Sequence, residues 1–202
     1  MRQGLFFDTE TSGLPVWSQP SEDPSQPHIV QLGGLLLDLD TRAELGQVDV
    51  IIKPDGWTIP DEVAAIHGIT TERAMDEGIP ERDAIEMLLE LWGKSSLRIA
   101  HNESFDMRIV RIGLKRLFPE RENLADLWKA APAYCTATKS TKLCAIPPTA
   151  KMVAAKRFHH KTPTLAEAYK HFTGKELEGA HSAMADTRGC ADVYFHLTPI
   201  PA

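Results

Sequence analysis

The sequence predicts an α/β protein in which a mixed β-sheet is flanked by helices. Short apolar runs near the N-terminus indicate strands, and further along the chain strand and helix patterns alternate. The 202 residues, 43% hydrophobic and 25% charged, have the length and composition of an ordinary globular domain with a full core. We therefore expect one domain over residues 1–202, with a basic, proline-interrupted excursion at about 127–166.

Four strands are expected from their apolar content. The first ends in an acid, and a Pro/Ser-rich loop at 18–27 follows it. The second and third bracket Asp40–Glu44, which has the composition of a hairpin connection. The expected strands are Gly4–Phe7, Ile29–Leu39, Val48–Ile52 and Leu97–Ala100.

Helices are predicted from start signals and apolar spacing. Pro60 and Pro80 each precede acids, which is typical of a first helical turn. Thr164 is the expected cap of a helix through about His171, with Gly174 as its stop. Further helices are expected around the apolar face from Ile85 to Trp92, from Ser104 to about Leu117, and from about Ala183 to Leu197.

Composition also excludes some classes of protein. The run GGLLLDLD is broken by acids well short of a membrane span, and the start MRQGLFFDTE is not a signal peptide. Three scattered cysteines, Cys135, Cys144 and Cys190, are expected to be free thiols. We therefore expect a cytoplasmic protein with no membrane segment.

Charge is distributed unevenly along the chain. The net charge is −6, yet the forty residues from Leu127 to Ala166 contain seven Lys or Arg and no Asp or Glu. Local potential steers an anion more than total charge does. This segment is therefore either a surface for nucleic-acid phosphates or a loop of ordinary solvated lysines.

The first candidate site residues are Asp8 and Glu10. On a strand, residues two apart point to the same face, so both carboxylates can converge on one divalent cation such as Mg²⁺ or Mn²⁺. Taken alone, the pair is equally typical of a solvated strand end. Asp106 lies in the expected first turn of the helix that Ser104 begins, where the helix dipole favours a carboxylate in any case.

His181 and Asp186 form the third candidate segment. Two side chains five positions apart on one helix point about 140° away from each other, so His181 and Asp186 would diverge if both were helical. If His181 lies on the loop before the helix, it can turn back toward Asp186. Taken alone, His181 is more typical of a packing residue at a helix start.

Together these segments resemble the motifs of the DEDDh (DnaQ-like) 3′–5′ exonuclease superfamily. Within it, the similarity is to the epsilon proofreading subunit of bacterial DNA polymerase III and its stand-alone and phage relatives. The matching segments, in the family's order, are DTETSGL at 8–14, AIHGIT at 65–70, HNESFD at 101–106 and HSAMAD at 181–186. The resemblance implies a ribonuclease-H-like fold and release of nucleoside 5′-monophosphates from DNA 3′ ends. No tail of the kind that tethers the replicative subunit to its polymerase is evident, so a stand-alone nuclease is expected.

The resemblance also implies roles for individual residues. Asp8, Glu10 and Asp186 would hold one divalent cation, Mg²⁺ or Mn²⁺, and Asp8 would share a second with Asp106. His181 would take a proton from the attacking water, a task that suits an imidazole near neutral pH. Five further residues match positions that surround the 3′-terminal nucleotide in the family: Thr11, Leu14, Ile66, His67 and Phe105.

Several alternatives stay open. An exoribonuclease of the same superfamily would use the same acids, although single-stranded DNA is the expected substrate. A nucleic-acid-binding module with a decayed site disagrees with the presence of all five catalytic residue types. Phe105 fits core packing as well as base stacking. A zinc site lacks the usual ligand spacing; its residues would be Cys135, Cys144, His159 and His160.

Overall fold

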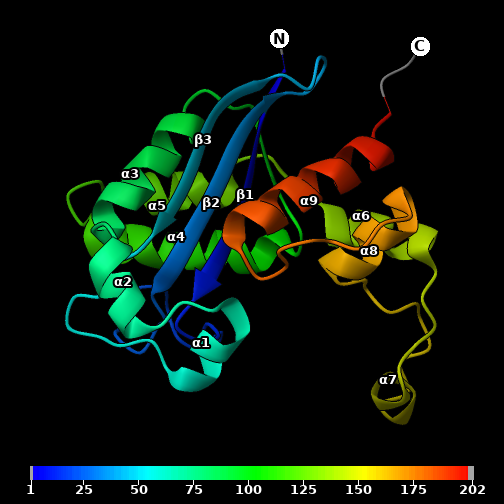
Figure 1. Ribbon diagram of the computed structural model, residues 1–202, viewed down its shortest axis with the longest axis horizontal. Helices are drawn as coiled ribbons and strands as arrows, with labels where there is room; N and C mark the ends of the chain where they lie inside the picture. The colour runs from blue at the N-terminus through cyan, green and yellow to red at the C-terminus, as the bar shows by residue number, and fades with distance from the viewer. Residues whose placement is uncertain (1, 200–202) are drawn as a thin grey trace.

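The computed structural model describes residues 2–199 and is built on one five-stranded sheet (Figure 1). The strands are β1 (Gln3–Thr11), β2 (Ile29–Asp38), β3 (Glu44–Ile51), β4 (Leu97–Ala100) and β5 (Ala133–Cys135). They lie in the order β3-β2-β1-β4-β5. β2 is antiparallel to both β1 and β3, whereas β1, β4 and β5 run parallel. The mixed sheet predicted from the sequence is confirmed.

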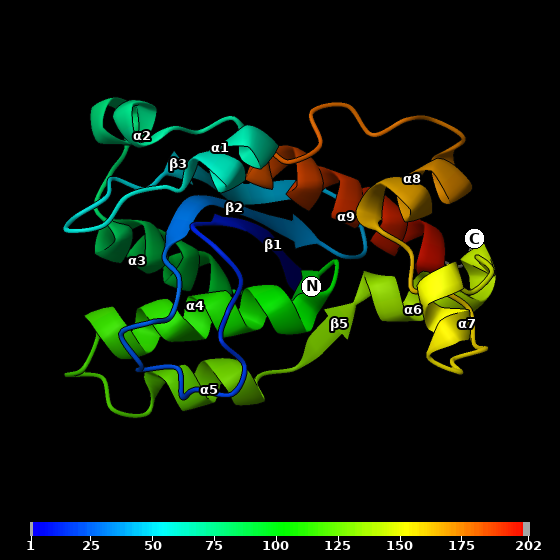
Figure 2. The same ribbon diagram turned by 90° about the horizontal axis from the view of Figure 1, so that it is seen from below.

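Helices cover both faces of this sheet. They are α1 (Asp61–His67), α2 (Thr71–Glu77), α3 (Glu81–Trp92), α4 (Glu103–Leu117), α5 (Leu124–Ala130), α6 (Thr136–Cys144), α7 (Ala150–Ala154), α8 (Leu165–Thr173) and α9 (Ala183–Leu197). Figure 2 shows α3, α4 and α5 on one face and α9 on the other, with α8 beside α9. Within residues 2–199, no helix is long and apolar enough to cross a membrane.

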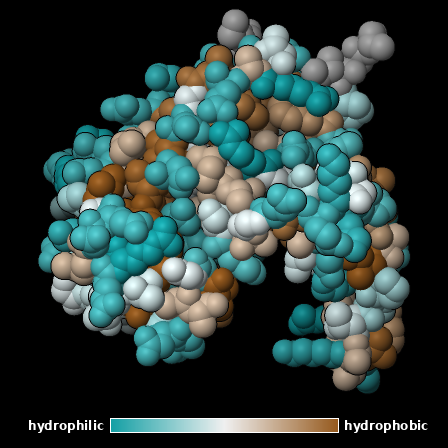
Figure 3. Space-filling model, viewed as in Figure 1, coloured by the Kyte–Doolittle hydropathy of each residue, from teal (hydrophilic) through white to brown (hydrophobic). Residues whose placement is uncertain are grey.

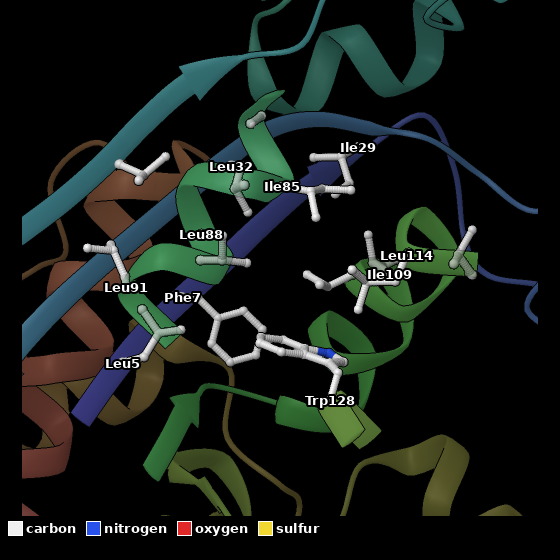
Figure 4. Packing of buried hydrophobic residues seen from close by; sticks show 14 of the residues in the cluster. Leu5, Phe7, Ile29, Leu32, Ile85, Leu88, Leu91, Ile109, Leu114 and Trp128 are labelled. Atoms are coloured by element: carbon white, nitrogen blue, oxygen red, sulfur yellow. The ribbon is translucent and has the colours of Figure 1, made fainter. Parts of the chain in front are cut away.

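Alternation along β1 divides the core into two parts. Phe7 faces the α3–α5 layer, where its ring meets the edge of Trp128 at 5.3 Å between centroids (Figure 4). Phe6 faces the opposite layer and contacts Tyr194 of α9 at 5.3 Å. Both phenylalanines are fully buried. Because strand side chains alternate, every even residue of β1 faces α9 and every odd residue faces α4.

The N-terminal end of α9 lies directly against β2. A Cβ atom at Gly33 would lie 2.5 Å from the carbonyl oxygen of Ala183, so only glycine permits this approach. The side-chain oxygen of Gln31 also accepts a hydrogen bond from the backbone N–H of Ala183 at 3.1 Å. These two contacts fix the first turn of α9 on the sheet.

Several predicted boundaries in the N-terminal half are wrong in detail. β1 does not end at Phe7 but continues to Thr11, because its later residues pair with β2 as far as Ile29. The acids expected just after the strand therefore lie within it. Pro60 and Pro80 occupy the N-cap positions of α1 and α3 rather than their first turns.

Ser104 is not the N-cap of α4. Asn102 occupies that position with φ of 68°, a left-handed conformation that asparagine tolerates better than most residues. Asp106 nonetheless lies in the first turn, as expected. The predicted caps of α8 are confirmed, since Thr164 forms a capping box and Gly174 ends the helix in the left-handed region.

The segment 127–166 is more ordered than the sequence predicts. It contains the end of α5, followed by β5, α6 and α7. β5 has only three residues, too few to show an alternating pattern in the sequence, and it forms by pairing with β4. Cys135, Cys144 and Cys190 are unpaired, as expected.

The Gly33 contact generates a stability prediction. Gly33→Ala forces a methyl group into the backbone of α9, which we expect to cost about 1–3 kcal/mol. For a protein of this size, each kcal/mol lowers the melting temperature by about 2–4 °C. Gly93→Ala is the matched control, because its Cβ would lie 3.4 Å from the nearest atom. Calorimetry that finds equal melting temperatures for Gly33→Ala and the wild type would contradict this account of how α9 is seated.

Candidate active site

β1 presents the first two acids. Asp8 and Glu10 follow Phe6 on the face of the sheet that α9 covers. In the β1–β2 register Asp8 lies opposite Gly33, and Glu10 lies opposite Gln31. The residues that seat α9 are therefore the direct cross-strand partners of the two acids.

α4 brings Asp106 to the same strand from the opposite face. Thr9, between the two acids of β1, donates two hydrogen bonds to the Asp106 Oδ1 atom, from its backbone N–H at 3.0 Å and its hydroxyl at 2.8 Å. Asp106 is only 2% exposed. Its position is thus fixed by the strand itself.

α9 supplies Asp186, and the loop before it supplies His181. The backbone N–H of His181 donates to Asp186 Oδ2 at 3.2 Å, which holds His181 at φ of 68°. The helix begins after Ser182, so His181 lies on the loop and turns back toward Asp186. Of the two geometries that the sequence allows, the structure shows the convergent one.

Three of these side chains could share one cation. One ligand atom each from Glu10, His181 and Asp186 lies within 4.8 Å of the other two, and this is the metal-type group found among residues 2–199. Oxygen-rich groups of this kind suit hard divalent cations. Among residues 2–199, the cysteines and histidines of the alternative zinc site form no such group.

Burial and mutual repulsion raise the pKa values of the inner two acids, Asp8 and Asp106. Burial raises the pKa of Asp8 well above its ordinary value, and the charges of Asp106, Asp186 and Glu10 raise it further. Burial raises the pKa of Asp106 to about 8, although the hydrogen bonds from Thr9 act in the opposite direction. The four acids therefore interact as one group.

The outer two acids are affected in the same sense. Burial raises the pKa of Glu10, with Asp186 adding to the effect and His181 opposing it. Burial also raises the pKa of Asp186, while the N–H of His181 opposes it. The Oδ1 atom of Asp186 is buried and has no hydrogen-bond partner. Unpaired buried carboxylate oxygens beside other carboxylates fit divalent cations, which would supply the missing positive charge.

The five residues expected around a terminal nucleotide fall into two groups. Leu14 and Ile66 are exposed apolar side chains, 81% and 58% accessible, so a ligand could cover them. Thr11 is buried and its hydroxyl donates to the Gly13 carbonyl at 2.8 Å. Phe105 is partly buried against the core, which gives it a packing role.

His67 belongs to the buried group. Its Nδ1 accepts from the backbone N–H of Ile69 at 3.1 Å, so the proton of the neutral ring lies on Nε2, which has no partner. Burial lowers the pKa of His67, and the nearby His181 lowers it further. The Nε2–H of a neutral His67 is therefore buried without a hydrogen-bond partner.

Sequence reasoning did not identify Thr9 and Gln31 as functional supports. Thr9 orients Asp106, and Gln31 caps α9. A signal for Thr9 exists in the sequence, because it alternates with the two acids and must face the other layer. No signal exists for Gln31, whose partner lies 152 residues further along the chain.

Comparison with known proteins identifies a family and similar folds. A family model described as exonuclease (RNase T) matches residues 5–194. The fold is similar to Escherichia coli exonuclease I in complex with a dT13 oligonucleotide, with 18% identity and a TM-score of 0.69 over 98% of this chain and 42% of that one. It is also similar to a moderately thermophilic exonuclease I from Methylocaldum szegediense, with 21% identity and a TM-score of 0.65 over 98% and 41%. The chain thus spans about two fifths of these relatives. A search of curated proteins found no match.

The acid cluster generates a prediction for the metal-free protein. The folded-state pKa values lie above the unfolded ones, so this contribution to stability is fully present below about pH 4 and is lost as the pH rises toward 8. Asp106→Asn keeps an oxygen for Thr9 but cannot ionise. In EDTA near pH 8 we expect the variant to melt several degrees above the wild type, and the difference to shrink as the pH falls and to vanish near pH 4.

Asp55→Asn, at an exposed loop position, is the matched control and should melt with the wild type. Adding Mn²⁺ near pH 8 should raise the melting temperature of the wild type more than that of Asp106→Asn. An Asp106→Asn protein less stable than the wild type near pH 8 in EDTA would show that this carboxylate is held by attraction instead.

Proposed function

The chain belongs to the RNase T family of exonucleases, in the DnaQ-like superfamily, and we propose that it hydrolyses DNA from the 3′ end and releases nucleoside 5′-monophosphates. One observation supports this above the others. Three separate segments of the chain bring five residues together at one end of β1: Asp8, Glu10, Asp106, Asp186 and His181. We further propose that residues 1–202 act as one exonuclease domain, and that the unpaired cysteines indicate the reducing cytoplasm.

Two divalent cations, Mg²⁺ or Mn²⁺, are part of the proposal. Asp8, Glu10 and Asp186 would hold one, and Asp8 and Asp106 the other. When bound, two such ions stabilise the attacking and leaving oxygens of an in-line phosphodiester displacement. The raised pKa values of the acids support this assignment, since bound cations would offset the repulsion among these carboxylates.

His181 is the proposed general base. Its ring is exposed beside Glu10 and Asp186, where a water can reach it. The hydrogen bond from its backbone to Asp186 holds the loop, so the ring is free to take a proton from the attacking water.

The terminal nucleotide would lie on the exposed side chains of Leu14 and Ile66, with Phe105 behind them and Thr11 bracing the loop. Apolar contact with a base is tolerant of sequence. The Nε2–H of His67 would donate to an oxygen of the nucleotide. The preference for single-stranded DNA is supported by the relatives, some of which are complexes of exonuclease I with single-stranded DNA.

The test uses DNA and RNA oligonucleotides of one sequence, labelled at either end. We expect DNA labelled at the 5′ end to shorten stepwise with Mg²⁺ or Mn²⁺, and the products to be 5′-monophosphates. Excess EDTA should abolish the reaction, and so should Asp8→Ala. Faster digestion of RNA would reassign the substrate, whereas digestion in EDTA or products with 3′-phosphates would overturn the proposed mechanism.

A second prediction concerns His181→Ala. Loss of the general base should lower kcat by about 10²–10⁴-fold, and the deficit should shrink at higher pH, where hydroxide is more available. Mn²⁺ should still raise the melting temperature, because four carboxylates remain. His171→Ala, at an exposed position on α8, is the control and should keep wild-type activity. Wild-type turnover by His181→Ala at neutral pH would assign the base to another group.

A further inference from the structure

Residues 146–161 form an arm that projects from the body of the protein. The backbone N–H of Lys161 donates to the carbonyl of Ile146 at 2.9 Å and closes the base of the arm. From Ala150 to His160, every residue except Met152 is exposed. Figure 1 shows α7 at the tip of this arm, well away from the sheet.

The base of the arm is fastened near the candidate active site. His101, which follows β4, donates from Nε2 to the carbonyl of Pro163 at 3.0 Å, and its Nδ1 contacts the hydroxyl of Thr136 at 2.9 Å. Lys161 pairs with Glu167 of α8 at 2.6 Å. The arm is thus anchored to the turn that leads to Asp106.

An open notch separates the arm from the part of the molecule that contains α1. Figure 3, in the view of Figure 1, shows this notch along the lower side of the surface. β1 ends on the α1 side of the notch, and the arm forms the opposite side (Figure 1). A polymer that leaves the candidate site on that side would pass along the arm.

The arm combines unpaired cations with an exposed aromatic ring. Lys151, Lys156 and Arg157 take part in no ion pair among residues 2–199, in contrast to Arg73 of α2, which pairs with Glu77. Phe158, next in the chain, is 71% exposed. Cations that track phosphates, interleaved with a ring on which a base stacks, are the features by which proteins bind single strands.

We propose that this arm binds the single-stranded DNA segment that leads into the active site, on the 5′ side of the nucleotide being removed. Lys151, Lys156 and Arg157 contact its phosphates, and Phe158 stacks on one of its bases. The arm itself, residues 146–161, contains no Asp or Glu, so this path is free of carboxylate repulsion. The inference rests on the proposed function, because it assigns the substrate strand of that same site.

The experiment compares Lys151→Gln/Lys156→Gln and Phe158→Ala with a control of equal charge change, Lys94→Gln/Lys129→Gln. Lys94 precedes β4 and Lys129 precedes β5, and both strands run toward the site, so the control residues lie at the far end of the sheet. Two substrates are used: a long single-stranded oligonucleotide, and thymidine 5′-(4-nitrophenyl phosphate), which is too small to reach the arm.

For the long substrate, the double arm variant should raise KM about 10- to 30-fold at 0.1 M salt and lower the salt slope of log KM by about 1.4, or 0.7 for each lost phosphate contact. Phe158→Ala should raise KM about 5- to 150-fold, the usual loss for one stacked base. Neither variant should change kcat, or the hydrolysis of the small substrate. The control should resemble the wild type on both substrates.

An unchanged KM for the long substrate would overturn the proposal, as would an equal loss on both substrates, which would indicate a structural role for the arm. Self-association that Phe158→Ala abolishes without altering KM would assign the arm to a second copy of the chain. Binding of the oligonucleotide is also measured by fluorescence anisotropy in EDTA. Arm-dependent binding without hydrolysis in Mg²⁺ or Mn²⁺ would contradict the proposed function while supporting the role of the arm.

Discussion

Repulsion among four carboxyl groups at the end of β1 is the constraint that the fold has to overcome. Asp8 is affected by the charges of the other three acids, and burial raises the pKa of each. The groups stay together because each belongs to an element that packs elsewhere through its own apolar face. β1 and α9 meet through the rings of Phe6 and Tyr194, an apolar contact that adjoins the acids along the same face of β1. Apolar burial in the core thus offsets an electrostatic cost at the site.

The parts of the site that depend on local geometry could be predicted from the sequence. The convergence of Asp8 and Glu10 follows from the two-residue period of a strand, and the start of α9 at Ala183 was visible in its composition. The support of α9 by Gln31 could not be predicted, since it depends on how a helix lies on a sheet. The N-cap of α4 could not be predicted either, because asparagine and serine are about equally favourable caps and composition does not choose between Asn102 and Ser104.

The basic segment shows the same division between local and tertiary information. Its charge was visible in the sequence, but its shape was not. α7 has only five residues and no buried face, so no apolar period marks it. The arm is instead held near its base by two contacts. His101 binds the carbonyl of Pro163, 62 residues away in the sequence, and Lys161 pairs with Glu167. A pattern of charges predicts what a surface attracts, whereas its placement depends on contacts between distant residues.

The separation of the arm from the acids also accounts for a nucleic-acid enzyme with a net charge of −6. Several cations on the body pair with neighbouring acids, as Arg82 does with Glu120 and Arg188 with Glu44. Cations placed beside the clustered carboxylates would pair with them and compete with divalent ions for the same oxygens. Free cations on a separate arm avoid both effects, because distance and salt screen the arm from the acids while it remains within reach of a long polymer. The charge distribution therefore separates the acids proposed to hold metal ions from the cations proposed to bind a polyanion.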